Sequence, residues 1–531
     1  MCTFAQNYYI MLRKIRIVLA TIFFFFITLL FLDFTGSIQA WMGWMAKIQF
    51  LPAVLAANAA VVIALILLTL IFGRVYCSVI CPMGVMQDII SWIHGRTRKK
   101  NRFRFSWSPE KRVLRIAILC TFIVLMILGL NSIAALVAPY SAYGRIAGSI
   151  FAPVYAAGNN ILAYFAERLD SYAFYTTDIW LRSIPVLIIA VLTFAIVGYL
   201  AWKGGRTYCN TICPVGTVLG FVSRFSFFRI VIDSGKCRNC GLCGRQCKAS
   251  CIDMKGHKVD LSRCVACMDC IGTCHEGALE YRFCPPWKTS GTGGDKKEKS
   301  MDSNAAAGAA HKAGGKESGN VQDNGRRTFI TSSAIVLGSA ALKAQDIKTD
   351  GGLAPIIKKK APKRGTALTP AGSIGHAHFY RHCTACQLCV AECPNNVLRP
   401  SSSLEHLMQP EMSYERGYCR PECNRCSQVC PAGAFHPVTI EEKSSIQIGR
   451  AVVDLELCVV NRDNVSCGNC ARHCPAGAIR LVRKDPEDPD SLRIPSVNPE
   501  RCIGCGACEH LCPARPLSAI HVEGNMVHHE I

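Results

Sequence analysis

The sequence predicts an α-helical membrane domain joined to small, cysteine-rich α+β modules. Two observations lead to this fold class. Long uncharged apolar runs crowd the first two hundred of the 531 residues, and hydrophobic residues make up 50% of the chain. The rest of the chain is more polar and holds most of the 32 cysteines. This uneven distribution indicates two classes of domain in one chain rather than a single globular domain.

Four apolar stretches of about twenty residues each are expected to cross a bilayer as helices. Arg13, Lys14 and Arg16 lie at the N-terminal end of the first stretch, and a basic segment at 94–104 follows the second. Positive charge marks cytoplasmic loops, so both segments are predicted to be cytoplasmic. The net charge of +22 is therefore interpreted as a topology signal, and no nucleic-acid partner is expected because no recognition motif accompanies it. The stretches are roughly 15–34, 53–73, 113–138 and 183–202.

A phrase is repeated at the ends of the second and fourth stretches: GRVYCSVICPMG at 73–84 and GRTYCNTICPVG at 205–216. It predicts two similar helical hairpins, each with a Cys-x3-Cys-Pro turn at its cytoplasmic end. Paired hairpins would bring four thiols together. These thiols could hold a further metal or cluster or form two redox dithiols, and the alternative is that the cysteines only pack at the helix ends. The repeated Arg74, Tyr76, Arg206 and Tyr208 are expected to act as anchors at the membrane interface, with contact to a quinone head group as the alternative. The four thiols, the thiol quartet below, are Cys77, Cys81, Cys209 and Cys213.

Two Cys-x2-Cys-x2-Cys-x3-Cys runs follow the membrane domain, which is assigned to 1–222. Their spacing predicts two cubane iron–sulfur clusters in a ferredoxin-like module at 223–285, since zinc usually takes two Cys pairs separated by a longer finger. Three cysteines of a run bind one cluster, and the fourth reaches the neighbouring cluster. Cys251 is a second candidate for the place of Cys247. The expected ligand sets are Cys237, Cys240, Cys243 with Cys274, and Cys264, Cys267, Cys270 with Cys247.

A linker and an export signal are predicted next. Residues 286–324 are rich in Gly, Ala, Ser and Lys and are expected to be disordered. Arg326, Arg327 and Phe329 then open an uncharged run that ends at Lys343, which has the form of a twin-arginine signal over 325–345. The alternative is a short amphipathic helix. The signal is also a possible fifth span, and it would place residues 223–324 in the cytoplasm and 346–531 on the far side of the membrane.

Four more cysteine groups occupy the last segment, and each ends in Cys-Pro. They predict four 4Fe–4S clusters, about six in the chain, because disulfide bridges explain repeated triplets poorly. Adjacent groups would exchange their fourth cysteines, or the first group would pair with the fourth and the second with the third. The nested scheme is favoured because the second and third groups are the irregular ones. The groups are Cys383, Cys386, Cys389, Cys393; Cys419, Cys423, Cys426, Cys430; Cys458, Cys467, Cys470, Cys474; and Cys502, Cys505, Cys508, Cys512.

Two known families resemble the two halves of the chain. Residues 1 to about 285 resemble the NapH-type membrane ferredoxin subunit associated with periplasmic nitrate reductases, which has four helices, two Cys-x3-Cys-Pro motifs and two cytoplasmic clusters. Residues 325 to about 525 resemble its partner, the NapG/MauM-type periplasmic ferredoxin, including the long gap in the third group. The resemblance implies a multi-pass protein of the inner membrane whose partners are the quinone pool and a periplasmic reductase or cytochrome.

The leading hypothesis is an iron–sulfur electron-transfer protein, a possible quinol dehydrogenase, passing electrons from quinol or a cytoplasmic donor to a periplasmic reductase. Clusters with every thiolate position filled have no open site for a substrate, which favours electron conduction. Two alternatives stay open: an assembly, maturation or regulatory factor for another metalloenzyme, and a structural zinc protein. The sequence does not indicate the terminal acceptor.

Overall fold

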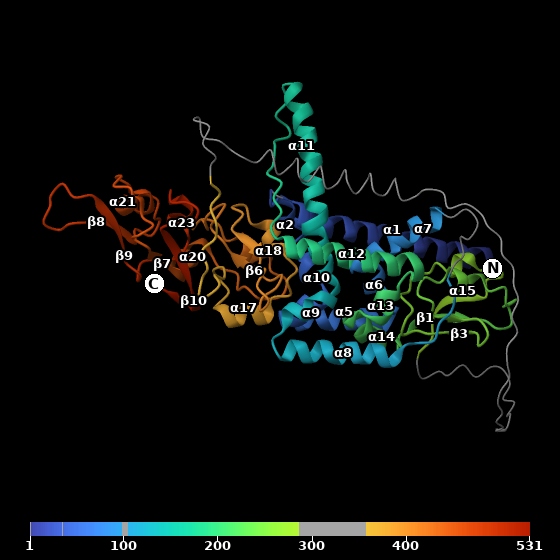
Figure 1. Ribbon diagram of the computed structural model, residues 1–531. Helices are drawn as coiled ribbons and strands as arrows, with labels where there is room; N and C mark the ends of the chain where they lie inside the picture. The colour runs from blue at the N-terminus through green and yellow to red at the C-terminus, as the bar shows by residue number, and fades with distance from the viewer. Residues whose placement is uncertain (1, 34, 98–104, 286–356) are drawn as a thin grey trace, which may run out of the picture. The chain divides into compact units, whose positions relative to one another are not determined.

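The computed structural model describes residues 2–33, 35–97, 105–285 and 357–531 (Figure 1). The described parts of 1–288 and 360–531 belong to one compact unit. The predicted linker at 286–324 and the predicted signal at 325–345 lie outside the described residues.

Four helices of the first half lie with their axes nearly parallel in Figure 1. They are α1 (Cys2–Leu32), α5 (Ala59–Phe72), α8 (Arg112–Ile127) and α12 (Ile184–Gly204). Shorter helices α2 (Ser37–Met42), α3 (Trp44–Lys47) and α4 (Phe50–Leu55) connect α1 to α5. Each of the four long helices lies within or overlaps one of the predicted apolar stretches.

Three helices among the described residues are long and apolar enough to cross a membrane: Met11–Leu32, Pro139–Arg168 and Ile184–Gly204. The first and third confirm the predicted stretches 15–34 and 183–202. The other two predicted stretches are interrupted, so four continuous spans are not confirmed. The stretch 53–73 is divided between α4 and α5, where the Asn58 side chain accepts a hydrogen bond from Val61 N and caps α5. The stretch 113–138 is divided between α8 and α9 (Asn131–Val137) at Gly129, whose φ of +78° ends the helix.

The helix over 139–168 was not predicted from the sequence. It consists of α10 (Pro139–Ile146), a π-helical turn η1 (Ala147–Phe151) and α11 (Ala152–Arg168). Arg145 and several small or polar residues lower its mean hydropathy to 1.2, against 2.6 for each of the other two candidate spans. Every residue of α10 is nevertheless buried. Tertiary packing therefore encloses a segment that the sequence alone marks as only moderately apolar.

The repeated phrases fold alike, each as a short helix, a Cys-Pro turn and a second helix, and we call these two units the hairpins. In the first, α6 (Val75–Val79) carries Cys77, and α7 (Pro82–Thr97) begins directly after Cys81. In the second, α13 (Thr207–Thr211) carries Cys209, and α14 (Pro214–Ser223) begins directly after Cys213. Proline suits the first position of α7 and of α14, because its missing N–H would have no partner there.

The module at 223–285 has the small α+β form expected for it. Strand β1 (Phe228–Ile232) pairs antiparallel with β4 (Leu279–Phe283), with Ile230 opposite Tyr281. Strand β2 (Ile252–Asp253) pairs antiparallel with β3 (Lys258–Val259). The helical turns α15 (Leu242–Gln246) and η2 (Ile271–Thr273) each precede the fourth cysteine of a run. We call this the two-cluster module.

The described residues 357–531 form a second α+β part, which we call the four-cluster module. Its strands pair antiparallel as β5 (Leu398–Pro400) with β6 (Pro410–Met412), β7 (Ile446–Val453) with β10 (Ile520–Glu530), and β8 (Ile479–Arg483) with β9 (Arg493–Val497). Its helices are α17 (His376–His382), α18 (Leu388–Glu392), α19 (Arg425–Val429), α20 (Ile440–Ser445), α21 (Val459–Arg462), α22 (Asn469–Arg472) and α23 (Ala507–Leu511). Helices α18, α19 and α23 each end one residue before the fourth cysteine of a group, and α22 ends two residues before it.

Candidate electron-transfer centres

The two-cluster module brings together the cysteines predicted for its first cluster. Burial raises the pKa of Cys243 to about 11, and repulsion by Cys274, Cys240 and Cys237 adds to this increase. The thiol of Cys274, from the second run, therefore lies beside the three thiols of the first run. This arrangement matches the expected exchange of fourth cysteines.

Cys247 lies beside the three other thiols of the second predicted set. It interacts electrostatically with Cys264, Cys267 and Cys270. The Cys251 Sγ is 3.5 Å from the Cys247 Sγ, and Cys251 also forms a hydrogen bond with Cys264. Contact with all three partners favours Cys247 as the fourth ligand, and Cys251 is a buried thiol next to it.

In the four-cluster module, the nested pairing of cysteine groups is wrong. Burial raises the pKa of Cys383 well above its usual range, and Cys386 and Cys430 contribute to the increase. Burial likewise raises the pKa of Cys426, with Cys419 and Cys393 contributing. Cys430 thus accompanies the first group, and Cys393 accompanies the second.

The third and fourth groups exchange cysteines in the same way. Burial raises the pKa of Cys470 to about 11, and Cys467, Cys512 and Cys458 add to the increase. Among the causes that raise the pKa of Cys508, burial comes first and Cys474 is one of the neighbouring thiols. The packing of helices agrees with this pairing, since α18 contacts α19 and α22 contacts α23.

The irregular gaps do not decide how the groups pair. The long gap of the third group is folded locally, where α21 begins directly after Cys458. The nested scheme assumed that the two groups with irregular gaps face each other. A long gap that folds within its own group does not require a partner with a long gap, so the gap lengths do not indicate which groups pair.

The second and fourth groups lie next to each other, which connects the two halves of the four-cluster module. Cys419 N donates a hydrogen bond to Cys505 O over 2.9 Å. The buried Tyr414 hydroxyl donates to Gly504 O over 2.6 Å, beside the same loop. The four cysteine sets therefore follow one another in the spatial order first, second, fourth, third.

The thiol quartet is assembled from both hairpins. All four cysteines are buried, with 4% or 5% of each residue exposed. Burial raises the pKa of Cys213 well above its usual range, and the other three thiols of the quartet add to the increase. Buried thiols that repel one another are stabilised as thiolates by a bound cation or cluster, so the donors suit such a group.

The arginines of the two repeated phrases cross between the hairpins. Arg74 Nη2 donates to Cys209 O over 3.3 Å, and Arg206 Nη1 donates to Cys77 O over 2.6 Å. Two glycines make this crossing possible. A Cβ on Gly84 would lie 2.7 Å from Arg206 Nη1, and one on Gly216 would lie 2.9 Å from Arg74 Nη2. The site therefore has approximate two-fold symmetry, as the sequence repeat implies.

Positive charge and N–H donors surround the quartet. Both arginine side chains are fully buried, and Arg74 Nη2 lies 3.7 Å from Cys77 Sγ. Gln87 Nε2 donates to Cys209 Sγ, and Gly216 N donates to Cys213 Sγ, each over 3.2 Å. In the described residues, Arg74 forms no salt bridge with a carboxylate. A buried cation needs compensation by an anion, and the neighbouring thiolates can supply it.

In the described parts of the chain, no group of three or more His, Cys, Asp or Glu side chains is close enough to hold a single metal ion.

A charged network links the quartet to the two-cluster module. Arg206 forms a two-point contact with Asp88 on α7, with Nε–Oδ1 at 2.7 Å and Nη2–Oδ2 at 2.8 Å. Lys248, next to Cys247, lies 3.0 Å from Asp88 and 2.9 Å from Asp269. Burial acts to raise the pKa of Asp269, but Lys248 and Arg16 outweigh it and hold this pKa at about 2.

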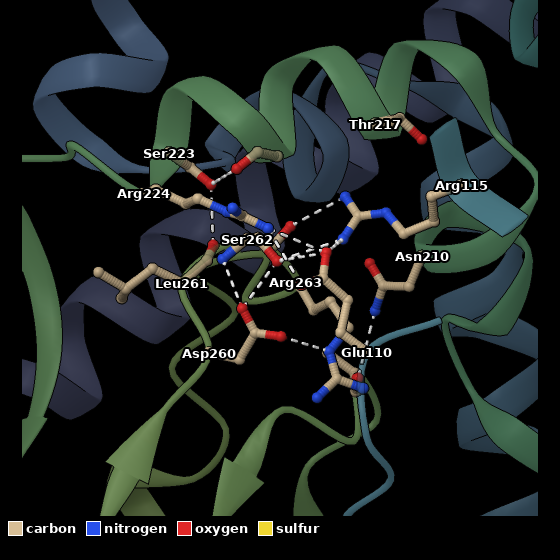
Figure 2. A network of polar contacts seen from close by, with 12 residues as sticks. Glu110, Arg115, Asn210, Thr217, Ser223, Arg224, Asp260, Leu261, Ser262 and Arg263 are labelled. Atoms are coloured by element: carbon tan, nitrogen blue, oxygen red, sulfur yellow. Dashed lines mark hydrogen bonds and ion pairs between the residues drawn. The ribbon is translucent and has the colours of Figure 1, made fainter. Parts of the chain in front are cut away.

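A second network fixes a loop of the two-cluster module against the helices. Figure 2 shows Ser262 and Asp260 on this loop, close to Glu110, Arg115 and Arg224. Glu110 contacts Arg115 at 2.6 Å and Arg224 at 3.0 Å, and the Ser262 hydroxyl donates to Asp260 over 2.7 Å. Arg74 Nη1 also donates to Ser262 O over 2.9 Å, which ties the loop directly to the quartet.

The repeated tyrosines are buried in the protein, with 2% of Tyr76 and 5% of Tyr208 exposed, and do not lie at a lipid interface as the interpretation from sequence expected. The Tyr76 hydroxyl donates to Gln49 Oε1 and accepts a hydrogen bond from Phe50 N. The Tyr208 hydroxyl donates to Val137 O over 2.8 Å. Sequence reasoning missed Gln87, Asp88 and the crossing of the arginines. The repeat itself was the signal for this crossing. Each phrase contains an arginine and a glycine, and the glycine of one hairpin makes room for the arginine of the other.

Comparisons with known proteins agree with iron–sulfur modules in both halves. The family described as "4Fe-4S binding domain" matches residues 55–101 and 184–231, and "4Fe-4S dicluster domain" matches 382–434 and 465–515. The first pair contains the two hairpins. Each range of the second pair contains the fourth cysteines of two adjacent groups, as the observed pairing requires. No solved structure matches the chain.

Curated relatives are ferredoxin-type and electron-transport proteins. The chain is 29% identical over 230 residues to the ferredoxin-type protein NapG of Escherichia coli, covering 39% of this chain and 91% of the relative. It is 28% identical over 162 residues to the methylamine utilization ferredoxin-type protein MauM of Methylobacillus flagellatus, covering 30% and 68%. It is 24% identical over 248 residues to the putative electron transport protein YccM of E. coli, covering 45% and 61%. The chain is thus similar to ferredoxin-type 4Fe–4S electron-transport proteins.

Proposed function

We propose that this protein is a membrane-bound carrier of about six 4Fe–4S clusters that passes electrons from quinol or a cytoplasmic donor to a reductase or cytochrome on the far side of the membrane. The observation that supports this most strongly is that the two cluster-bearing modules contact opposite ends of the same helices.

The two-cluster module contacts the beginning of α1 and the end of α5. Arg13 Nε lies 2.8 Å from Asp269 Oδ1, near the start of the apolar part of α1. Phe227 N donates to Leu70 O, and the Tyr281 hydroxyl donates to Phe72 O, both at the end of α5. The basic residues that predict a cytoplasmic location lie at this end.

The four-cluster module contacts the other ends of these helices. Arg425 Nη1 donates to Thr35 O, which follows α1. A Cβ added to Gly433 would lie 3.1 Å from Ala56 Cα, just before α5 begins. Since α1 includes a helix of membrane-spanning length, this arrangement supports opposite sides for the modules and the export of 346–531 by the predicted signal.

The quartet is proposed to hold a redox group between the modules. Its thiols, its two buried guanidinium groups and the N–H donors at its sulfurs suit an anionic, thiolate-bound cluster. Such a group would exchange single electrons. Arg74 and Arg206 would offset its negative charge, and Gln87 would donate a hydrogen bond to a ligand sulfur.

Three measurements test the proposal. Iron and acid-labile sulfide in the purified protein should match about six cubane clusters, plus any group at the quartet. Quinol analogues should reduce the clusters in native membranes. Cys209→Ser should leave insertion and the other clusters intact but abolish this reduction, whereas Cys120→Ser, which changes an exposed cysteine on the apolar helix α8, should have no effect. If quinol analogues and dithionite both leave the clusters oxidised, electron transfer is the wrong function, and a role in maturing another metalloprotein takes its place.

A further inference from the structure

Helix α10 fills the space between the thiol quartet and the first cysteine group of the four-cluster module. All eight of its residues are buried, and Tyr143, Arg145 and Ile146 expose none of their surface. The quartet, four residues of α10 and the cysteines 383, 386 and 389 belong to one continuous core. The protein matrix between the two redox sites is therefore closely packed.

On the side of the four-cluster module, α10 makes backbone contact. A Cβ added to Gly144 would lie only 2.2 Å from Cys386 O, so glycine is required at this position. Tyr140 interacts electrostatically with Cys386 and with Cys430, the two thiols that belong to the first cluster from different groups. Its hydroxyl is buried and has no hydrogen-bond partner.

On the side of the quartet, the contact runs through Tyr208, the neighbour of Cys209. Its hydroxyl donates to Val137 O, in the turn that leads into α10. Arg145 interacts electrostatically with both Tyr208 and Cys386, so one side chain reaches from the quartet to the first group.

Arg145 lacks a counter-charge among the described side chains. Its Nη2 donates to Ala135 O over 2.9 Å, while Nε and Nη1 are buried without a partner. A buried cation of this kind is costly unless an anion lies nearby. A thiolate-bound cluster at Cys386 is negatively charged and supplies that anion, which explains why arginine is tolerated inside the core.

A second buried arginine occupies the corresponding place on the other side of the quartet. Arg74 donates to Ser262 O and interacts with Cys264, a ligand of the nearer cluster of the two-cluster module. Each gap that leads away from the quartet thus contains one fully buried arginine.

We propose that electrons cross the membrane within this single chain, from the cluster at Cys264 through the quartet and across α10 to the first cluster of the four-cluster module, with Arg145 as a positioning residue that stabilises the reduced state of that cluster. This inference deepens the proposed function. Each transfer oxidises one centre and reduces the next by one electron. One negative charge therefore crosses the membrane per electron, and a cation must follow.

The path is tested with the full chain in closed vesicles that contain ferricyanide, with dithionite added outside. Molecules whose two-cluster module faces outward should take electrons from dithionite and reduce the trapped ferricyanide, one electron for each. Because charge crosses the bilayer, a potassium ionophore should accelerate the reaction. If trapped ferricyanide is reduced no faster in wild-type vesicles than in protein-free vesicles, the proposal is wrong.

Two glycines provide a matched pair of variants. Gly144→Ala places a methyl group against Cys386 O and should reduce the flux to that of protein-free vesicles while six clusters remain. Gly158→Ala on α11 has nothing within 4 Å of the new methyl group and should behave as wild type. If electrons reach trapped ferricyanide at the same rate in both variants, α10 is not part of the path.

Arg145 is tested by a readout other than flux. Arg145→Gln should make the reduction potential of the first cluster more negative in a spectroscopic titration, and Arg145→Lys should restore most of it. A Gln variant with an unchanged potential would contradict the role of Arg145. Quinol analogues distinguish the proposed function from the proposed path. If they reduce the clusters although no electrons reach trapped ferricyanide, the proposed function stands and the transmembrane path fails. If no donor reduces any cluster, both fail.

Discussion

Replacing Asp88 by Asn should open the structure around the thiol quartet. Asp88 is the two-point partner of the fully buried Arg206 and also contacts Lys248 at 3.0 Å and Arg16 at 3.6 Å. Removing one partner of a buried ion pair costs about 3–5 kcal/mol, because the remaining charge stays buried without compensation. Since about 1.4 kcal/mol corresponds to a tenfold change, local opening should become roughly two to more than three powers of ten more frequent.

Hydrogen exchange measured by mass spectrometry reports this opening, through the amides of α6 and α13. Asp463→Asn is the matched control, because its pair with Arg462 is exposed and solvent screening leaves it little effect on stability.

The dependence on pH gives a second check of the same ion pair. Burial acts to raise the pKa of Asp88, but Arg206 and Lys248 hold it well below its usual value. A depressed carboxyl pKa stabilises the fold fully above the unfolded pKa, near 3.8, and this contribution is lost as the pH falls through the folded pKa. The difference between wild type and Asp88→Asn should therefore persist at neutral pH and shrink in strong acid. If Asp88→Asn exchanges no faster than Asp463→Asn, the reasoning about the buried ion pair is wrong.

Four further predictions follow from the same structure. Iron analysis should find roughly 24 atoms per chain in about six clusters, and a value near two, or zinc in place of iron, would contradict the cysteine assignments. A reporter fused after Ile531 should be active outside the cytoplasm. Changing Arg326 and Arg327 to Lys should retain the reporter inside while the apolar helices still insert. Cytoplasmic activity of the unaltered fusion would contradict the export hypothesis. Cys430→Ser should make Cys383, Cys386 and Cys389 reactive toward alkylating agents, whereas exposure of Cys458 and Cys467 would restore the nested scheme. Burial lowers the pKa of His528 to about 4, so the contribution of the neutral imidazole to stability is complete above pH 6.5 and is lost as the pH falls toward 4. His528→Gln should therefore flatten the dependence of the free energy of unfolding on pH in this range. An unchanged pH dependence would contradict this prediction.

The cysteine spacing alone predicted six groups of cluster ligands, and the structure places the four thiols of each predicted set in the two-cluster module together. This was possible because three ligands of a cluster lie on one short loop, so their geometry is encoded locally. The sequence also determined the quartet. Two closely similar phrases are expected to fold alike, and two like hairpins in one core bring their cysteines together.

Contacts between residues far apart in the sequence decided the rest. Cys393 and Cys430 exchange places because α18 packs against α19, and no local spacing specifies which helices meet. Helix α10 was missed because Arg145 lowers its hydropathy, although the packed core encloses that arginine completely. Spacing along the chain fixes which atoms one loop can present, whereas the pairing of loops and the compensation of a buried charge depend on what the rest of the chain places opposite them.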